Sequence, residues 1–204
     1  MERRGLAHYD RAYFDKWYRH PRFRVKSPLD MRRQMQFVVA ATEYVLDRPV
    51  RRVLDVGCGE GNWRPVLKRI RPKVRYYGVD GSSYAVQRFG KRRNIRLGAF
   101  GSLGALGLPG AFDLILCLGV LNYVAAPELR RGLRQMIPRL RGLAYLEIFT
   151  RDDDATGDFT QEYARSPRWY RREFREAGLV SLGMHCYLPR RLAGYTAALE
   201  RAEA

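Results

Sequence analysis

A short apolar segment that runs directly into a glycine-rich loop constrains the fold of this chain most. Residues 51–56 read Arg-Arg-Val-Leu-Asp-Val, which predicts a buried strand, and Gly57, Gly59 and Gly61 follow. Glycine tolerates positive φ angles and lets the backbone approach a ligand closely. A strand that ends in such a loop, followed by a helix, is typical of α/β folds that bind ligands at the carboxyl ends of parallel strands.

The rest of the chain alternates between strand and helix patterns. Further strands are predicted at residues 74–79, 94–99, 112–118 and 143–149, and helices at residues 63–70, 83–89, 127–140 and 168–177. Two final strands, at 180–187 and 195–199, are predicted to pair as a hairpin. Because right-handed β–α–β units build mainly parallel sheets, we expect an α/β class fold: a single Rossmann-like, doubly wound domain.

Residues 1–49 are predicted to form a helical extension, or lid and substrate segment, before a main domain at 50–204. Ser27 followed by Pro28 predicts the start of a helix that runs to about residue 46. Before Pro21, aromatic residues recur at spacings typical of one helical face: Tyr9, Tyr13, Trp17 and Tyr18. This face is predicted either to cover a bound ligand or to pack on the core.

Composition narrows the class of protein. At 204 residues and 46% hydrophobic content, the chain suits one globular domain. No apolar run reaches the roughly 20 residues of a membrane span, and residues 1–10 lack the apolar core of a signal peptide. We therefore expect a cytoplasmic protein without membrane association. Cys58, Cys117 and Cys186 lack metal-ligand spacing and are expected to be reduced and buried, so no metal site is predicted.

The chain carries a formal net charge of +17. Such a charge favours contact with nucleic acid or another polyanion. However, arginine supplies nearly all the basic residues and is spread along the chain, a pattern that biased codon usage also produces. Nucleic acid therefore stays an alternative partner. The acidic stretch at 151–154, with Asp158, is expected to be a solvated turn rather than a metal site.

The spacing of the loop glycines indicates the kind of ligand. Dinucleotide-binding loops read GxGxxG, whereas this loop reads GxGxG and has Asp55 two residues before its first glycine. This pattern disfavours a pyrophosphate, and so a nucleotide-dependent oxidoreductase, and favours a sulfonium cation with an amino-acid tail that Asp55 can attract. Asp80 closes the second strand, where its carboxylate can accept hydrogen bonds from both hydroxyls of a ribose.

Three segments together resemble the successive motifs of class I S-adenosylmethionine-dependent methyltransferases. They are Val53 to Gly61, Tyr77 to Asp80, and Phe112 to Ile115. The resemblance covers roughly residues 50–200. It implies an enzyme that uses S-adenosylmethionine, built on a seven-stranded, mostly parallel sheet with an antiparallel last strand.

The resemblance also implies where the cofactor binds. The expected cofactor-binding residues are Asp55, Gly57, Cys58, Gly59, Gly61, Asp80, Gly81, Ser82, Phe100, Gly101, Ser102, Leu118 and Tyr123. Many relatives carry an acidic residue after the third strand, where it meets the adenine amino group, but this chain has none there. Backbone groups or Ser102 are expected to serve instead, with Phe100 packed on the adenine.

The acceptor of the methyl group is less constrained. A small molecule is favoured by the compact chain, with an RNA or protein acceptor and a non-catalytic cofactor-binding protein as alternatives. Asn122-Tyr123 lacks the prolines of the motif in enzymes that methylate adenine or glutamine amino groups. The expected acceptor-binding residues are Tyr13, Trp17, Tyr18 and Asn122. Neither His20 nor His185 is assigned as a general base, so no catalytic residue is named.

Overall fold

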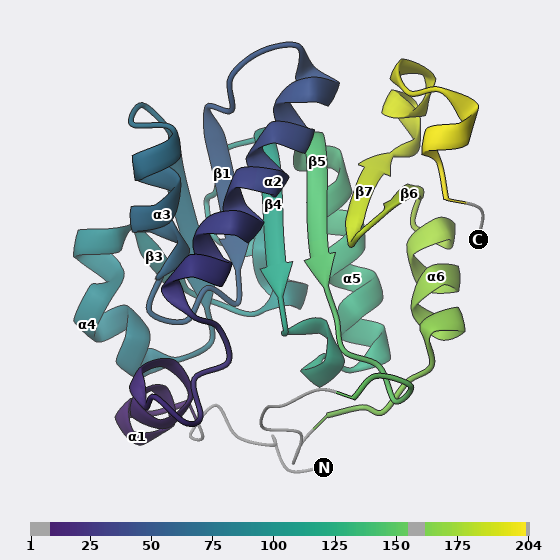
Figure 1. Cartoon of the computed structure of the whole chain (residues 1–204). Helices are drawn as coiled ribbons and strands as arrows, with labels where there is room; N and C mark the ends of the chain where they lie inside the picture. The colour runs from purple at the N-terminus through teal and green to yellow at the C-terminus, as the bar shows by residue number, and fades with distance from the viewer. Residues whose placement is uncertain (1–8, 155–161, 203–204) are drawn as a thin grey trace.

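A seven-stranded sheet with helices on both faces forms the protein, whose computed structural model describes residues 9–154 and 162–202 (Figure 1). The strand order is β3-β2-β1-β4-β5-β7-β6. The strands are β1 Arg52–Val56, β2 Arg75–Asp80, β3 Ile95–Leu97, β4 Phe112–Leu118, β5 Leu140–Glu147, β6 Leu179–Gly183 and β7 Cys186–Pro189. β1 to β5 pair in parallel, and β7 is antiparallel to β5. The predicted Rossmann-like sheet with an antiparallel last strand is therefore confirmed.

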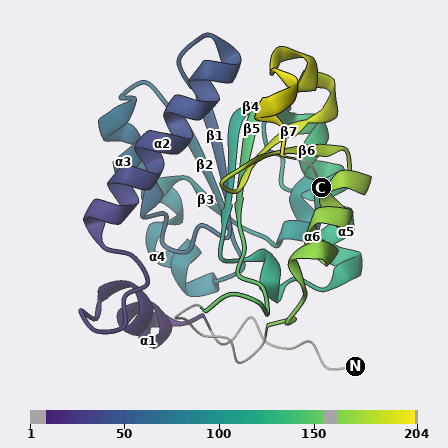
Figure 2. The same ribbon diagram turned by 45° about the vertical axis from the view of Figure 1, so that its right-hand side comes forward.

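Helices cover both faces of the sheet in two layers (Figure 2). One layer holds α2, α3 and α4, and the other holds α5 and α6. The helices are α1 Arg11–Phe14, α2 Pro28–Leu46, α3 Trp63–Ile70, α4 Ser83–Arg93, α5 Ala126–Met136 and α6 Pro167–Glu176, with a π-helix at Asp15–Arg19. Short 3-10 helices occupy Phe100–Ala105, Leu121–Tyr123, Ile137–Arg139, Arg190–Tyr195 and Ala198–Glu200.

Capping residues place the helix starts where the sequence predicts them. Ser27 and Asp30 form a reciprocal capping box at the start of α2, with Pro28 at the first helical position. The Ser82 side chain accepts a hydrogen bond from the backbone N–H of Ala85 at the start of α4. Such caps satisfy backbone donors that a helix start leaves unpaired, so these residues stop each helix from extending into the preceding strand or loop.

The sheet lies at the centre of the core. Residues 112–117 of β4 are all buried, as expected for a central strand covered on both faces. α2 contributes Met35, Val38 and Val39 to the same core, packed against β4 and β5. The expected division of the chain at residue 49 stays a prediction, although the buried face of α2 packs directly on the sheet.

The predicted C-terminal hairpin is wrong in its placement. The segment at 180–187, expected to be one strand, folds back on itself to give β6 and β7, and residues 195–199 lie in 3-10 turns and their flanks. The chain reverses at Met184 and His185, which both have positive φ angles. These residues rarely adopt that conformation, so the turn carries no recognisable sequence signal.

Residues 9–19, called the N-terminal segment from here on, lie beyond the carboxyl ends of the parallel strands (Figure 1). The helix begins at Arg11, so Tyr9 of the predicted aromatic face precedes it, and α1 passes into the π-helix, which ends at Arg19. His20 is extended, as expected for a residue that precedes a proline. Among the described residues, no helix combines the length and the hydropathy that a bilayer crossing requires.

Candidate functional site

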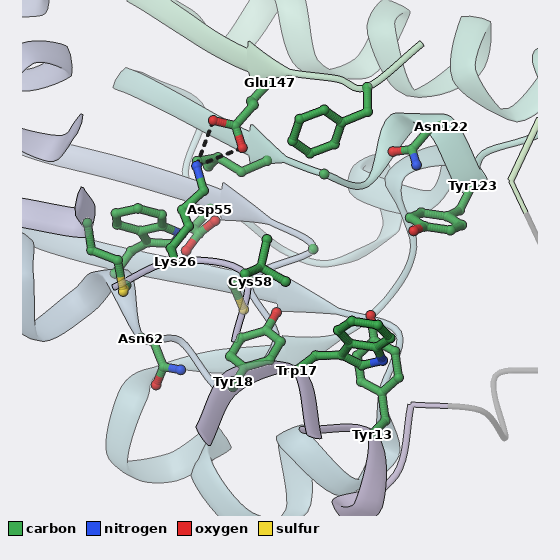
Figure 3. Close-up of a pocket in the computed structure, with 17 residues that line it drawn as sticks. Tyr13, Trp17, Tyr18, Lys26, Asp55, Cys58, Asn62, Asn122, Tyr123 and Glu147 are labelled. Atoms are coloured by element: carbon green, nitrogen blue, oxygen red, sulfur yellow. Dashed lines mark hydrogen bonds and ion pairs between the residues drawn. The ribbon is translucent and has the colours of Figure 1, made fainter. Parts of the chain in front are cut away.

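A cavity opens between the carboxyl ends of β1, β4 and β5 and the N-terminal segment (Figure 3). The predicted residues that line it are Tyr13, Trp17, Tyr18, Asp55, Gly57, Cys58, Leu118, Asn122 and Tyr123. Residues that sequence reasoning missed also line it: Val25, Lys26, Met31, Asn62, Trp63, Gly119, Glu147 and Phe149. The structure thus brings together the first residues of the glycine loop, three of the four predicted N-terminal aromatic residues and the end of β4.

The glycine loop keeps a conformation that other residues rarely adopt. Gly57, Gly59 and Gly61 have φ angles of 71°, 54° and 72°. A methyl group on Gly57 would lie 2.2 Å from the Val120 side chain, so both the backbone angle and the space demand glycine there. The backbone N–H groups of Gly57 and Cys58 donate to the Val79 carbonyl, which fixes the loop against β2.

Asp80 ends β2 and organises the base of the site. Its two carboxylate oxygens accept hydrogen bonds from the backbone N–H groups of Gly59, at 2.6 Å, and Ser82, at 2.8 Å. Each oxygen retains a lone pair that can accept a ribose hydroxyl. Burial raises the pKa of Asp80, against the opposing effect of these two hydrogen bonds. The side chain therefore fits the predicted ribose contact, although it does not line the main cavity.

Asp55 is a carboxylate that lies in the wall of the cavity and is 1% exposed. Burial raises its pKa to about 7, while a hydrogen bond donated by the Tyr76 hydroxyl, at 2.6 Å, opposes that rise. A buried carboxylate of this kind gains most from a cation placed beside it. Asp55 and Asp80 together therefore fit a ligand with a cationic tail and a ribose.

The N-terminal segment covers the glycine loop through aromatic contacts. A methyl group on Gly59 would lie 2.9 Å from both the Phe14 ring and the Tyr18 hydroxyl. Phe14 also stacks on Tyr84 of α4, with 5.7 Å between ring centroids. The Arg19 guanidinium pairs with the buried Glu60 carboxylate of the loop, which ties the π-helix to it. These contacts pack the segment against the glycine loop and α4, and its role in covering a bound ligand stays a prediction.

Several predicted cofactor residues lie outside the cavity wall. Phe100 is buried against Gly132 of α5, so its ring packs in the core. The Ser102 hydroxyl bonds to the backbone of Ala99 and caps its own 3-10 turn. Gly101 donates to Glu128 and accepts from Arg131. The adenine contact therefore stays a prediction, without a side chain that the structure favours for it.

The remaining predicted cofactor residues are Gly61, Gly81 and Ser82. The position of a Cβ on Gly61 faces Ile95 and Tyr76, and Gly81 links β2 to the cap of α4. The Ser82 hydroxyl donates to the Tyr9 carbonyl at 2.5 Å, which fixes the N-terminal segment above Asp80. These residues shape the loop and its cover.

The described histidines, Cys117, Cys186 and the acidic turn lie outside the cavity, whereas Cys58 lines it. His185 lies in the β6–β7 turn rather than in a strand, and His20 follows the π-helix; neither lines the cavity. Cys58, Cys117 and Cys186 are buried free thiols. Asp153 accepts hydrogen bonds from Thr150 in the acidic turn, and Asp158 lies outside the described residues. Within residues 9–154 and 162–202, no cluster of three metal-ligating side chains occurs.

Comparison with known families decides the family. A family model described as a methyltransferase domain matches residues 28–191. The chain belongs to this methyltransferase family. The match confirms the resemblance read from the sequence motifs, together with the predictions of an enzyme and of S-adenosylmethionine as its cofactor.

Individual proteins resemble this chain in sequence or in fold. An uncharacterized protein from Synechococcus sp. is 32% identical over 111 residues, which are 51% of this chain and 26% of that protein. This methyltransferase chain therefore spans about a quarter of the length of that relative. The plantazolicin methyltransferase BamL is 15% identical with a TM-score of 0.64, over 95% of this chain and 81% of BamL. A methyltransferase from Archaeoglobus fulgidus is 15% identical with a TM-score of 0.62, over 83% of this chain and 75% of that one.

Proposed function

We propose that this methyltransferase transfers the methyl group of S-adenosylmethionine to a small-molecule acceptor bound in the aromatic cavity. One observation carries the proposal: a single cavity is lined both by the glycine-loop residues Asp55, Gly57 and Cys58 and by the N-terminal aromatic residues Tyr13 and Trp17. A cofactor on the loop and an acceptor under the aromatic rings would therefore meet in the same enclosed space. A recessed aromatic cavity suits a small molecule better than a folded RNA or protein.

The residues of the chain have separable tasks in this reaction. S-adenosylmethionine supplies an activated methyl group on a sulfonium, so the protein mainly aligns the reactants and excludes water. Asp55 is placed to hold the cationic tail of the cofactor, and Asp80 to hold its ribose. Trp17 and Tyr18 cover the cavity, and we expect the segment at 9–19 to move when the cofactor enters. BamL, crystallised with a plantazolicin analogue and SAH, supports a small acceptor by analogy of fold.

Loss of the Asp80 carboxylate tests the assignment of the cofactor site. We expect Asp80→Asn and Asp80→Ala to weaken S-adenosylmethionine binding more than tenfold, because the ribose hydroxyls lose their anionic acceptor. A tenfold loss corresponds to about 1.4 kcal/mol. Titration calorimetry on the full chain measures this affinity, and circular dichroism checks that each variant folds.

Asp152→Asn is the matched control, since Asp152 is exposed in the acidic turn and its substitution should leave the affinity unchanged. If the native chain binds no S-adenosylmethionine, the proposed function is wrong. If it binds the cofactor but both Asp80 variants bind equally well, Asp80 does not belong to the site. Transfer of labelled methyl to a small-molecule fraction rather than to RNA or protein then tests the acceptor class.

A further inference from the structure

Glu147 places a carboxylate in the cavity at the carboxyl end of β5. Its side chain is 7% exposed and accepts two hydrogen bonds from the Lys26 ammonium, at 2.8 and 2.7 Å, and one from the Gln34 amide, at 2.5 Å. Gln34 also donates to the Tyr145 hydroxyl at 2.8 Å. These contacts come from α2, from the loop before it and from β5, so they hold the carboxylate rigidly. One lone pair, on Oε1, stays available to a ligand.

Asn122 contributes a second acceptor to the same cavity. Its side chain is 1% exposed, and its Oδ1 has no hydrogen-bond partner among the described residues. Its amide nitrogen donates to the Glu162 carboxylate at 3.4 Å, which orients the oxygen the other way. Figure 3 shows the Asn122 oxygen on the side of its amide that is turned toward Glu147; Asn122 lines the cavity, and this oxygen is itself buried. A buried acceptor without a partner is costly, so a ligand that donates to it would bind favourably.

The charge of the cavity differs in sign from that of the chain. Its charged lining residues are Asp55, Glu147 and Lys26, whereas the chain as a whole carries +17. The ammonium of Lys26 lies between Glu147 and the Trp63 ring, 5.8 Å from the ring centroid. The Glu147 carboxylate and the Trp63 ring therefore already bind one cation, the Lys26 ammonium. The Lys26 ammonium is already engaged by both Glu147 oxygens and by the Gln34 amide oxygen, so an anionic acceptor would have to compete for it.

We propose that the methyl acceptor is an amine nitrogen of a small aromatic or apolar molecule, positioned by Glu147 and Asn122. This inference rests on the proposed function and names its substrate class. A neutral primary amine has two N–H donors and one lone pair. Glu147 Oε1 and Asn122 Oδ1 accept from the two donors, which leaves the lone pair free to point at the methyl group. Phe149 and Tyr123 supply apolar walls for the rest of the molecule.

Glu147 stabilises the charge that this transfer creates. The amine enters after losing one proton to water. Its lone pair forms the new N–C bond, the S–C bond of the sulfonium breaks, and that electron pair stays on sulfur. The positive charge passes from sulfur to nitrogen, next to the Glu147 carboxylate, and the N-methylammonium product leaves with it or releases a proton to water. A fixed carboxylate where positive charge develops lowers the barrier.

An alcohol acceptor is served poorly by the same residues. Oxygen must lose its proton to become a good nucleophile, so it needs a general base. Proton transfer to Glu147 would break its salt bridge with Lys26, and no described histidine lines the cavity. The arrangement therefore favours an acceptor that needs no base during the transfer.

Matched acceptor pairs test the nucleophile. The full chain is incubated with methyl-labelled S-adenosylmethionine and with amines and alcohols of equal skeleton: benzylamine and benzyl alcohol, 2-phenylethylamine and 2-phenylethanol, tryptamine and tryptophol. Binding to the chain saturated with SAH is measured in parallel by calorimetry. We expect amines to be methylated, and to bind at least tenfold more tightly than their alcohols above pH 8, where more of the amine is neutral.

Two variants test the residues. Glu147→Gln keeps the shape but removes the charge, so we expect kcat for the amine to fall at least tenfold while its KM changes less. Asn122→Ala removes an acceptor used in the ground state, so we expect the KM to rise at least fivefold. Both should keep the native affinity for S-adenosylmethionine. Glu176→Gln on α6, where the carboxylate is 62% exposed, is the matched control and should behave as the native chain.

The outcomes separate this inference from the proposed function. A native chain that fails to bind S-adenosylmethionine overturns the proposed function itself. A chain that binds the cofactor but methylates alcohols in preference to amines overturns only the amine assignment. The amine assignment is equally wrong if no amine is methylated or bound better than its alcohol, or if Glu147→Gln leaves kcat for the amine unchanged.

Discussion

Among single residues, we expect Asp55 to couple cofactor binding to pH. Burial raises its pKa to about 7, and a cationic cofactor tail bound beside it would favour its ionised form. Below pH 7 the free protein must release this proton to bind the cofactor. We therefore expect the affinity to rise between pH 5.5 and 7, by up to tenfold per unit, and then to level off. Calorimetry over this pH range measures the effect.

Asp55→Asn serves as the control for this titration, because an amide cannot ionise. The variant should bind the cofactor more weakly at pH 7.5 and show a flat profile from pH 5.5 to 7. A native profile without slope would place the cationic tail away from Asp55. A slope that persists in Asp55→Asn would assign the proton to another group, with Asp80 the next candidate because burial raises its pKa as well.

Gly57 shows how a single glycine fixes the loop. An alanine there would hold an unfavourable φ of 71° and bring its methyl group within 2.2 Å of Val120. We expect Gly57→Ala to lower the free energy of unfolding by about 2 to 4 kcal/mol, from the left-handed conformation and the overlap together. Urea denaturation measures the loss. Adding Val120→Ala should restore part of it, whereas Gly110→Ala, where a methyl group meets nothing within 4 Å, should be neutral.

Glu147 and Lys26 line the cavity, but nothing in the sequence indicates that they do. They are 121 positions apart, and each looks like an ordinary charged residue in its own segment. Asp55 and Asp80, by contrast, stand beside glycines at the ends of predicted strands, so local spacing was enough to find them. A salt bridge between distant segments depends on how α2 packs against β5, and no local pattern encodes that contact.

At the scale of elements, the β6–β7 turn can be stabilised by substitution, because its two residues are unsuited to the positive φ angles that they adopt. Met184 and His185 form a two-residue turn with φ angles of 48° and 63°. Asn-Gly is strongly preferred in such turns. We expect Met184→Asn with His185→Gly to raise the free energy of unfolding by about 1 kcal/mol, as the left-handed strain is relieved. Chemical denaturation of the full chain measures the gain. Met184→Gln, at the same 72% exposed position, should change little, and a destabilised double variant would contradict the turn.

The same turn explains where the prediction of elements failed. The first five strands and the helices between them were predicted to within a few residues, because each follows an apolar period bounded by glycine, proline or serine. After α6, the alternating apolar pattern at 180–187 runs through the turn without a break, since Met184 continues it. Only backbone geometry separates β6 from β7, so the hairpin was assigned to the wrong pair of segments.

Across the whole molecule, basic side chains cover both faces of the sheet. α6 carries the exposed Arg168 and Arg171 on one side, and α4 carries the exposed Arg88 and Arg92 on the other (Figure 2). The cavity itself is lined by two carboxylates and one lysine. This distribution favours weak contact with polyanions over many surfaces, and it places no arginine among the described residues that line the cavity.

Charge-matched variants on opposite faces test whether RNA has a defined place on the molecule. We expect Arg168→Gln with Arg171→Gln, and Arg88→Gln with Arg92→Gln, to weaken binding of single-stranded RNA to a similar, small extent. Affinity should fall steeply with salt in both, because the remaining phosphate contacts still release counterions. Filter binding between about 50 and 200 mM salt measures this, with methyl transfer to amines followed alongside. A loss confined to one face, together with methylation of the RNA, would make nucleic acid the acceptor instead.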